Sequence, residues 1–283
     1  MNKNLIRIIP FLDIKNGLLI KGINLEGLRI IGKAENFSNY YYKSGADEIC
    51  YIDNVATLYG TNNLSKFINN TAKDIFIPLT VGGGIRNIQD IKSMLLAGAD
   101  KICINSAAIE DINFLKKASR IFGSANITVI IQSIKIDDKY FISSSNGREI
   151  HKVNPFDWAK KVEDFGAGEI VITSVNKEGL KKGFDLKLIK KISEIVSIPT
   201  IAHGGAGSFD DIYKVIKFSK INGVGLGSLL HYETLNLFPK FMPETGNTDF
   251  LNNIVKKKKT INLISKLKKY LKSKKINVRD EKK

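Results

Sequence analysis

Short motifs of this chain recur about 121 residues apart, and this repetition constrains the fold more than any other feature. Gly-Ala-Asp-Glu-Ile at residues 45–49 returns as Gly-Ala-Gly-Glu-Ile at 166–170, and Val-Gly-Gly-Gly at 81–84 returns as Ala-His-Gly-Gly at 202–205. The repeat is much longer than the unit of a solenoid protein, and it therefore predicts an internal duplication. We expect two equivalent halves, each containing the same number of structural units.

Apolar runs rich in isoleucine and valine alternate with longer amphipathic segments along the chain. Continuous apolar runs are typical of parallel strands that are buried on both faces, and the amphipathic segments have the period of surface helices. Eight such units predict an α/β fold, namely a single (β/α)8 TIM barrel with two-fold internal duplication. We expect strands near 8–14, 48–52, 78–81, 102–104, 128–131, 170–173, 200–202 and 223–226, and helices near 34–44, 64–72, 88–97, 111–122, 155–165, 186–196, 209–219 and 260–274.

All residues 1–283 are expected to belong to this one barrel, with an insert at about 237–258 before the last helix and a basic C-terminal segment at 256–283. The basic segment holds thirteen Lys or Arg and two acidic residues, so it supplies +11 of the formal net charge of +16. Such a run can attract nucleic acid, but stacking aromatics are almost absent from it. We interpret it as a solvated helix face, and a nucleic-acid partner is not expected.

Other features bear on the compartment and on cofactors. Cys50 and Cys103 each lie in an apolar run without the spacing of a zinc site or a redox pair, so we expect two buried thiols. No apolar run approaches the ~20 residues of a membrane span, and no signal-peptide pattern precedes the first strand. The three histidines lack metal-site spacing. We expect a cytoplasmic protein with no membrane association, no metal and no cofactor.

Each half has a glycine-rich turn after its third strand and a small polar turn after its fourth. These turns contain Gly83-Gly84 and Asn105-Ser106 in the first half, and Gly204-Gly205 and Gly227-Ser228 in the second. Glycines let backbone N–H groups approach an anion, and the N-terminus of a following helix favours negative charge. Barrels commonly bind phosphate after strands seven and eight. The duplication therefore predicts two phosphate sites at one mouth, against the alternative that the glycines only shape tight turns.

Polar side chains at strand ends are the candidate catalytic groups, because barrel enzymes place such groups there. Asp13 ends the first strand, and its counterpart at the end of the fifth strand is Gln132. A carboxylate transfers protons, whereas an amide cannot exchange one near neutral pH. Four further polar residues lie at or just past other strand ends: Lys21, Asp53, Asn176 and Glu178. They either bind substrate and support the proton chemistry or are solvated loop residues.

A second set of charges precedes or begins strands one, two, four and six, at the opposite end of the predicted barrel. Arg7, Glu48, Lys101 and Glu169 provide two positive and two negative groups there. They either form a structural salt-bridge cluster or gate a channel through the barrel. The residue pattern by itself favours the structural alternative.

Four motifs are specific in combination: Arg-Ile-Ile-Pro-Phe-Leu-Asp (7–13), Phe-Ile-Pro-Leu-Thr-Val-Gly-Gly-Gly-Ile-Arg (76–86), Ala-Asp-Lys-Ile-Cys-Ile-Asn-Ser-Ala-Ala (99–108) and Gly-Ala-Gly-Glu-Ile (166–170). With them the chain resembles the family of the cyclase subunit of imidazole glycerol phosphate synthase and its paralogues in surface-glycan clusters. The resemblance implies a lyase-type subunit of a glutamine amidotransferase complex, a heterodimer with a glutaminase at the N-terminal face. Ammonia then crosses the barrel and converts a bis-phosphorylated formimino nucleotide into imidazole glycerol phosphate in histidine biosynthesis.

The resemblance also implies roles for particular residues. Asp13, Lys21 and position 132 are implied as catalytic, the turn with Glu178 and Gly179 as substrate-binding, and the charged set at the other end as an ammonia gate. That reverses the preference for a structural salt-bridge cluster.

The chain departs from the family at the second catalytic aspartate, which is Gln132. Two alternatives to the cyclase therefore stay open: a paralogue that supplies ammonia for amidino-sugar synthesis, and an inactive barrel that only activates its glutaminase.

Overall fold

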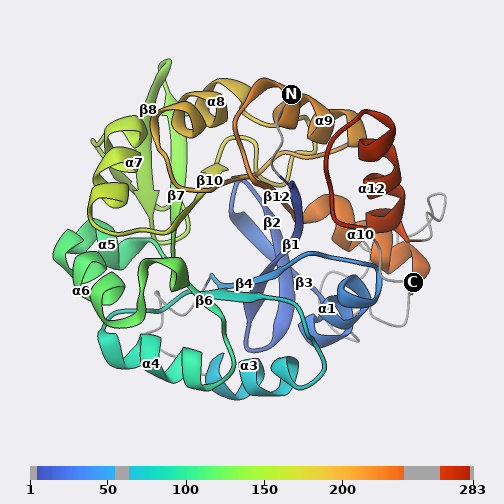
Figure 1. Cartoon of the computed structure of the whole chain (residues 1–283), viewed down its shortest axis with the longest axis horizontal. Coiled ribbons are helices and arrows are strands. Elements are labelled where there is room, and N and C mark those ends of the chain that lie inside the picture. Colours follow the sequence, from blue (N-terminus) through green and yellow to red (C-terminus); the bar gives the residue numbers. More distant parts are fainter. Residues whose placement is uncertain (1–4, 55–63, 239–261, 281–283) are drawn as a thin grey trace.

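The computed structural model describes residues 5–54, 64–238 and 262–280. Eight parallel strands pair in sequence order, and the last, β12, pairs with the first, so the sheet closes into a barrel (Figure 1). The predicted TIM barrel is therefore confirmed. The strands are β1 (Arg7–Lys15), β4 (Ile49–Asp53), β5 (Leu79–Gly82), β6 (Lys101–Ile104), β7 (Ile127–Ile136), β10 (Glu169–Ser174), β11 (Thr200–His203) and β12 (Gly223–Leu226).

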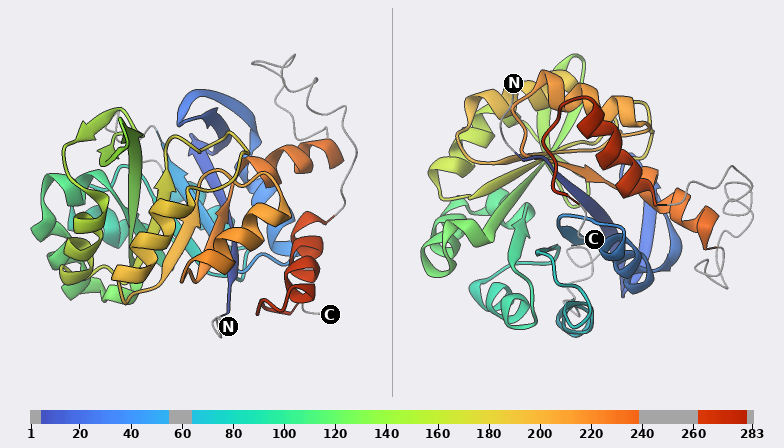
Figure 2. Two further views of the ribbon diagram at one scale, coloured as in Figure 1. Left: turned by 90° about the horizontal axis from the view of Figure 1, so that it is seen from above. Right: turned by 45° about the vertical axis from the view of Figure 1, so that its right-hand side comes forward.

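A ring of helices surrounds the strands, as Figures 1 and 2 show. All eight predicted helices are present within a few residues of their expected ends. They are α1 (Ala34–Lys43), α3 (Leu64–Ala72), α4 (Ile88–Leu96), α6 (Ile112–Phe122), α7 (Pro155–Asp164), α8 (Leu186–Ile195), α9 (Phe209–Phe218) and α12 (Leu263–Ser273). A short 3-10 helix, η1 (Ser124–Asn126), precedes β7. None of the described helices is long and apolar enough to cross a membrane.

Local sequence signals explain where several helices begin. The side chain of Asn87 accepts a hydrogen bond from Asp90 N, and Asp90 returns one to the Asn87 backbone, which is a capping box before α4. Asn154 caps α7, whose first residue is Pro155, the residue type whose fixed φ suits that position. These caps satisfy backbone N–H groups that have no partner inside the helix.

Two helices are missing from the sequence-based prediction, and they occupy equivalent places in the two halves. α5 (Ser106–Glu110) follows β6, and α10 (Ser228–Leu237) follows β12. α5 is too short to show a helical period, and α10 lacks a strongly amphipathic pattern. Each begins at the serine of a predicted phosphate turn, so the duplication extends to the elements that bear on the site.

The core has two layers. A large outer layer packs the strands against the helices, and a small inner cluster fills the barrel interior. The two thiols predicted to be buried belong to that inner cluster, as free cysteines. The inner cluster consists of Ile9, Phe11, Cys50, Cys103, Ile130, Val171 and Ile201.

Two antiparallel hairpins extend the first strand of each half. β2 (Leu18–Ile23) and β3 (Glu26–Lys33) follow β1, while β8 (Lys139–Ser144) and β9 (Glu149–His151) follow β7. The β2–β3 hairpin lies over one end of the barrel, and the start of β1 and α12 lie toward the other (Figure 2). The sequence analysis predicted neither hairpin. The carboxyl ends of the strands and the hairpins therefore form the mouth.

The C-terminal predictions are only partly within the described residues. α10 ends at Leu237, and the predicted insert near 237–258 lies outside the described residues after position 238. Of the basic segment at 256–283, residues 262–280 are described and form α12 and a short tail. Lys266 and Lys269 are exposed there, as expected, but Lys268 is buried. The interpretation of this segment as a wholly solvated helix face is therefore wrong at Lys268.

Candidate functional site

A buried ion-pair chain lies at the mouth of the barrel. Lys21 Nζ, from the β2–β3 hairpin, lies 2.7 Å from Asp13 Oδ2 in the second half of β1, which runs on to Lys15, and it also donates to the carboxylate of Glu178. Lys21 is 1% exposed, and both carboxylate residues are buried, as is Asp53. The alternative of a solvated loop residue is therefore wrong for Lys21, Asp53 and Glu178, whereas Asn176 is exposed in a turn. The structure brings Asp13, Lys21 and Glu178 together as one unit.

The hairpin tip explains how Lys21 reaches this place. Asn24 and Leu25 have φ values of 52° and 65°, which a two-residue type I′ turn requires. Such values are unusual for a leucine, and contacts from two neighbouring loops hold the turn. Asn24 N donates to Glu178 O at 2.8 Å, and Asn146 Nδ2 donates to Leu25 O at 2.9 Å. The hairpin is thus anchored across the mouth, with Lys21 pointing into it.

The opposite charges of this buried ion-pair chain stabilise one another. Burial opposes ionisation of Glu178, but the ammonium of Lys21 outweighs it and lowers the pKa of Glu178 to about 2. Burial likewise disfavours the ammonium of Lys21, yet Asp13 and Glu178 together raise its pKa. Both directions indicate that Lys21 and Glu178 are charged at neutral pH.

The second-half phosphate turns form a small cavity beside this chain. Gly205 has a φ of 113°, and a Cβ there would lie 2.3 Å from Gly183 O, so only glycine fits. The hydroxyl of Ser228 is buried and has no hydrogen-bond partner among the described residues. Ser228, which lines the cavity, is the first residue of α10, where backbone N–H groups have no partner within the helix. The cavity is lined by Glu178, Gly179, Gly204, Gly205, Gly227 and Ser228 among others.

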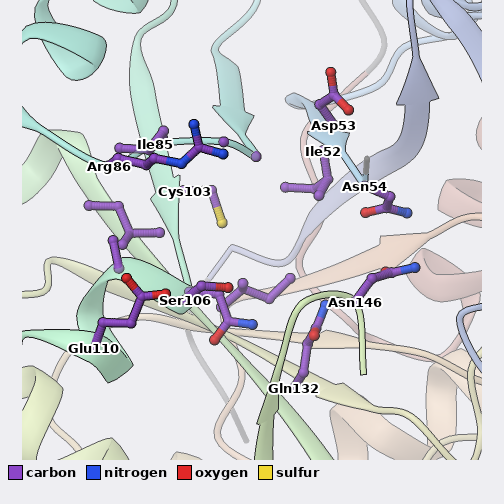
Figure 3. Close-up of a pocket in the computed structure, with 16 residues that line it drawn as sticks. Ile52, Asp53, Asn54, Ile85, Arg86, Cys103, Ser106, Glu110, Gln132 and Asn146 are labelled. Atoms are coloured by element: carbon purple, nitrogen blue, oxygen red, sulfur yellow. The ribbon is translucent and has the colours of Figure 1, made fainter. Parts of the chain in front are cut away.

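The first-half turns form a larger pocket on the other side of the mouth (Figure 3). Gly83 has a φ of 101°, and a Cβ there would lie 2.3 Å from Asp53 O. Ser106 begins α5, and the side chain of Arg86 adds a cationic group to the rim. The predicted residues that line this pocket are Asp53, Gly83, Gly84, Asn105, Ser106 and Gln132. The two sets of turns therefore form two polar cavities at one mouth, as the duplication predicts.

Gln132 occupies the position opposite Asp13 in the duplication. Its side-chain oxygen is buried and has no hydrogen-bond partner among the described residues. The side chain is among those drawn around the pocket in Figure 3. An unpaired buried acceptor is costly, so this oxygen is suited to accept a hydrogen bond from a ligand.

His203, which the sequence places in a phosphate turn where it could pair with a phosphate, also belongs to the mouth, as does Thr173, for which the sequence predicts no role. His203 Nδ1 lies 3.0 Å from Thr173 Oγ1, its ring stacks on Phe11 at 4.4 Å, and its Nε2 lies 3.8 Å from Glu178 Oε2. Burial lowers the pKa of His203, which favours a neutral ring. One feature of the sequence sets His203 apart: its counterpart in the first half is a glycine, Gly82.

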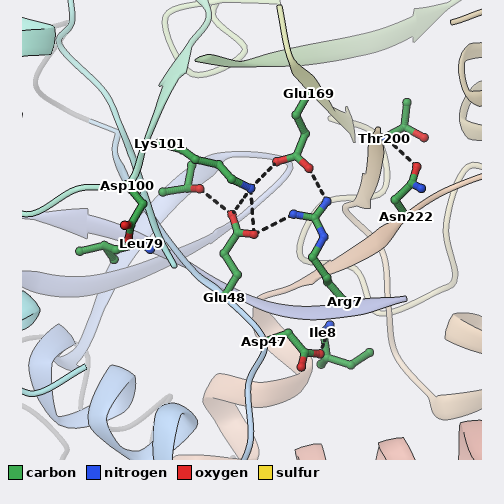
Figure 4. Close-up of polar contacts among 11 residues, drawn as sticks. Arg7, Ile8, Asp47, Glu48, Leu79, Asp100, Lys101, Glu169, Thr200 and Asn222 are labelled. Atoms are coloured by element: carbon green, nitrogen blue, oxygen red, sulfur yellow. Dashed lines mark hydrogen bonds and ion pairs between the residues drawn. The ribbon is translucent and has the colours of Figure 1, made fainter. Parts of the chain in front are cut away.

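The four charged residues at the opposite end form a closed ring of ion pairs (Figure 4). Arg7 lies 2.8 Å from Glu48 and also contacts Glu169, and Lys101 Nζ lies 3.1 Å from both carboxylates. Thr80 Oγ1, which the sequence analysis did not identify, donates to Glu48 at 2.5 Å. This ring lies across the amino end of the barrel interior.

The described residues contain no group of three or more His, Cys, Asp or Glu side chains placed to hold a metal ion. His231 is buried between Tyr41 OH at 2.7 Å and Phe11 O at 2.8 Å, and burial lowers its pKa to about 3. It therefore acts as a neutral packing residue. The carboxylates and the glycine turns of the mouth are suited to proton transfer and anion binding.

Comparisons with known proteins agree with this geometry. A protein family described as "Histidine biosynthesis protein" matches residues 7–236 of the chain. The imidazole glycerol phosphate synthase subunit HisF of Legionella pneumophila is 46% identical over 207 residues, which are 73% of this chain and 98% of that protein. The subunit of the same name from Bacillus cereus is 41% identical over 227 residues, covering 80% of this chain and 90% of that protein. That from Clostridium botulinum is 41% identical over 233 residues, covering 82% and 92%.

Proposed function

The chain belongs to the histidine biosynthesis protein family, and on this basis we propose that it is the cyclase subunit of an imidazole glycerol phosphate synthase. Its substrate is a formimino nucleotide with a phosphate at each end. Ammonia cleaves this molecule and closes an imidazole ring, which gives imidazole glycerol phosphate and an aminoimidazole carboxamide ribotide. The enzyme is a lyase-type member of a glutamine amidotransferase complex.

The observation that carries this proposal is the pair of polar cavities on either side of the Asp13–Lys21–Glu178 chain. Each is built from a glycine turn with positive φ and from the N-terminus of a helix that begins at a serine. Both features favour an anion. A substrate with two phosphates would span the mouth and bring its central part over Asp13.

Asp13 is the proposed proton-transferring group. Its Oδ2 is held by Lys21 at 2.7 Å, so its orientation is fixed, and its other oxygen is left for the substrate. Gln132 cannot exchange a proton near neutral pH. We assign to it the role of orienting the substrate through its side-chain oxygen, which has no partner among the described residues.

The amino end of the barrel is the proposed docking face for a glutaminase subunit. Large apolar side chains are exposed in the segments that lead into the strands there: Phe76 and Leu96 are each 77% exposed, and Phe218 is 58% exposed. They lie just before β5, at the end of α4 and at the end of α9. Large apolar side chains exposed at one end of the barrel favour a protein interface there. The ion-pair ring lies in this face, where it would control the entry of ammonia into the barrel.

Neither alternative, the amidino-sugar subunit or the inactive barrel, draws support from the relatives described above. The test is complementation of a bacterium that lacks its cyclase gene. Expression of this chain together with its glutaminase partner should restore growth without histidine, and Asp13→Asn should not. Failure of the wild-type pair to restore growth, with both proteins present in the cells, would refute the proposal. A cytoplasmic location remains a prediction.

A further inference from the structure

The carboxylate of Asp47 links the C-terminal segment to the starts of β1 and β4, beside Arg7 and Glu48 of the ion-pair ring. Asp47 Oδ2 accepts a hydrogen bond from Ile8 N at 2.8 Å. Its other oxygen, Oδ1, lies 2.7 Å from Lys268 Nζ on α12 and 2.7 Å from Arg279 Nε in the tail. Lys268 is 2% exposed. Three separate parts of the chain therefore meet at Asp47.

Backbone contacts reinforce this meeting point. Asn277 O accepts a hydrogen bond from Ile6 N at 2.9 Å, and Lys268 Nζ also donates to Gly45 O at 2.7 Å. The guanidinium of Arg279 donates to Ala46 O at 2.5 Å. A buried ammonium and a guanidinium that are both hydrogen-bonded in this way hold the tail in one position.

The residues held in this way are the immediate neighbours of the gate. Ile6 and Ile8 flank Arg7, and Asp47 precedes Glu48. Figure 4 shows Asp47 and Ile8 beside the ion-pair ring. Arg7 and Glu48 themselves lie 2.8 Å apart, so a small shift of either strand start would open that pair.

The link through Asp47 to the C-terminal segment is present in only one of the two duplicated halves. Two other polar side chains lie just before a strand, as Asp47 does: Asp100 before β6 and Asn222 before β12. Each accepts a hydrogen bond from the neighbouring strand, from Leu79 N and Thr200 N respectively. The counterpart of Asp47, however, is Gly168, which precedes Glu169 and has no side chain to do this. The Arg7–Glu48 side of the ring is thus fastened to the C-terminal segment, whereas its Glu169 side lacks such a carboxylate.

We propose that Asp47, Lys268 and Arg279 are positioning residues, through which the C-terminal segment sets the geometry of the ammonia gate. This inference rests on the proposed function of the ring. Loss of the clamp would release the starts of β1 and β4 and open the Arg7–Glu48 side. Ammonia made by the partner would then escape before it reaches the mouth. Turnover on ammonia supplied in solution would not change, because Asp13 lies at the other end of the barrel.

The experiment compares Lys268→Met with Lys269→Met, an exposed neighbour on the same helix. Each variant, in complex with the glutaminase, is assayed for product formed per glutamine hydrolysed and for turnover with an ammonium salt. Breaking a buried pair is strongly destabilising locally, so Lys268→Met should lower product per glutamine by about twofold or more. Lys269→Met should match the wild type. Turnover with the ammonium salt should be unchanged in both.

Equal product per glutamine in the two variants would overturn the inference. If Lys268→Met fails to fold, as judged by its melting temperature, Arg279→Gln gives the same test, because that side chain is 39% exposed and its loss spares the core. Hydrogen exchange of the isolated subunit provides a readout without the partner. Amides of residues 6–9 and 46–50 should exchange faster in Lys268→Met than in Lys269→Met, and equal exchange would refute the clamp. Absence of product from the wild type and ammonium salt would instead refute the proposed cyclase function.

Discussion

Replacement of Lys21 by methionine tests how much the buried ion pairs at the mouth stabilise the fold. The side chain is 1% exposed and is the shared partner of Asp13 and Glu178, so Lys21→Met keeps its approximate volume and leaves two buried carboxylates without their cation. Removal of one partner from a buried ion pair costs about 3–5 kcal/mol. We therefore expect a loss of that size in the free energy of unfolding at pH 8.

The pH dependence of this loss follows from the lowered pKa of Glu178. In the wild type this pKa is about 2, so the pair contributes stability above the unfolded pKa of about 4.3, and the contribution is lost as the pH falls toward 2. In Lys21→Met the pKa of the unpaired Glu178 carboxyl should rise instead, because burial disfavours its charged form. Protonation then removes the uncompensated buried charge as the pH falls. The difference between variant and wild type should therefore shrink from pH 8 to pH 5.

The assay is urea denaturation followed by circular dichroism at several pH values between 5 and 8. Lys190→Met, which removes an exposed lysine of α8, is the control and should change stability by less than about 0.5 kcal/mol. A loss below about 1 kcal/mol for Lys21→Met, or a loss that does not vary with pH, would refute the reasoning.

Four further predictions concern activity. Asp13→Asn should lower turnover by about 10²-fold or more, because it removes the proposed acid–base group; steady-state turnover near the wild-type rate would contradict this. Gln132→Asp should raise turnover on the cyclase substrate, because the carboxylate keeps an acceptor oxygen for the substrate and adds a second proton-transferring group; no increase in a folded variant would contradict a benefit from a second carboxylate. Ser228→Ala should weaken substrate binding about 10- to 100-fold, since a hydrogen bond to a charged group contributes ~1.5–3 kcal/mol. Its folding stability should be unchanged, because that hydroxyl has no partner among the described residues; an unchanged dissociation constant would argue against the second phosphate site. Lys101→Ala should uncouple glutamine hydrolysis from product formation, measured as product per glutamine, and full coupling would argue against a gate.

Much of the fold follows from the sequence because its signals are local and repeated. The Ile and Val runs and the duplicated glycine motifs predict the eight strands, and short-range caps such as Asn87 with Asp90 support the helix starts. The glycines of the phosphate turns are readable for a similar reason. Positions such as Gly83 and Gly205 have positive φ and no room for a Cβ, so the residue type itself reports the geometry.

The features that the sequence does not predict depend on contacts between distant segments. Lys21 reaches Glu178, 157 residues away, only because the β2–β3 hairpin folds over the mouth. The leucine in the turn of that hairpin has none of the usual residue preferences for positive φ. The burial of Lys268 is hidden in a run of lysines, since its partner Asp47 lies 221 residues earlier. Such pairings need the closed barrel before they can be seen.

The central claim is that this barrel uses ammonia to cyclise a doubly phosphorylated formimino nucleotide at Asp13. The most direct measurement is turnover of the purified chain with that nucleotide and an ammonium salt, with imidazole glycerol phosphate detected as the product. We expect multiple turnovers by the wild type and a loss of about 10²-fold or more in Asp13→Asn. Absence of product from a folded wild-type protein that binds the nucleotide would contradict the claim.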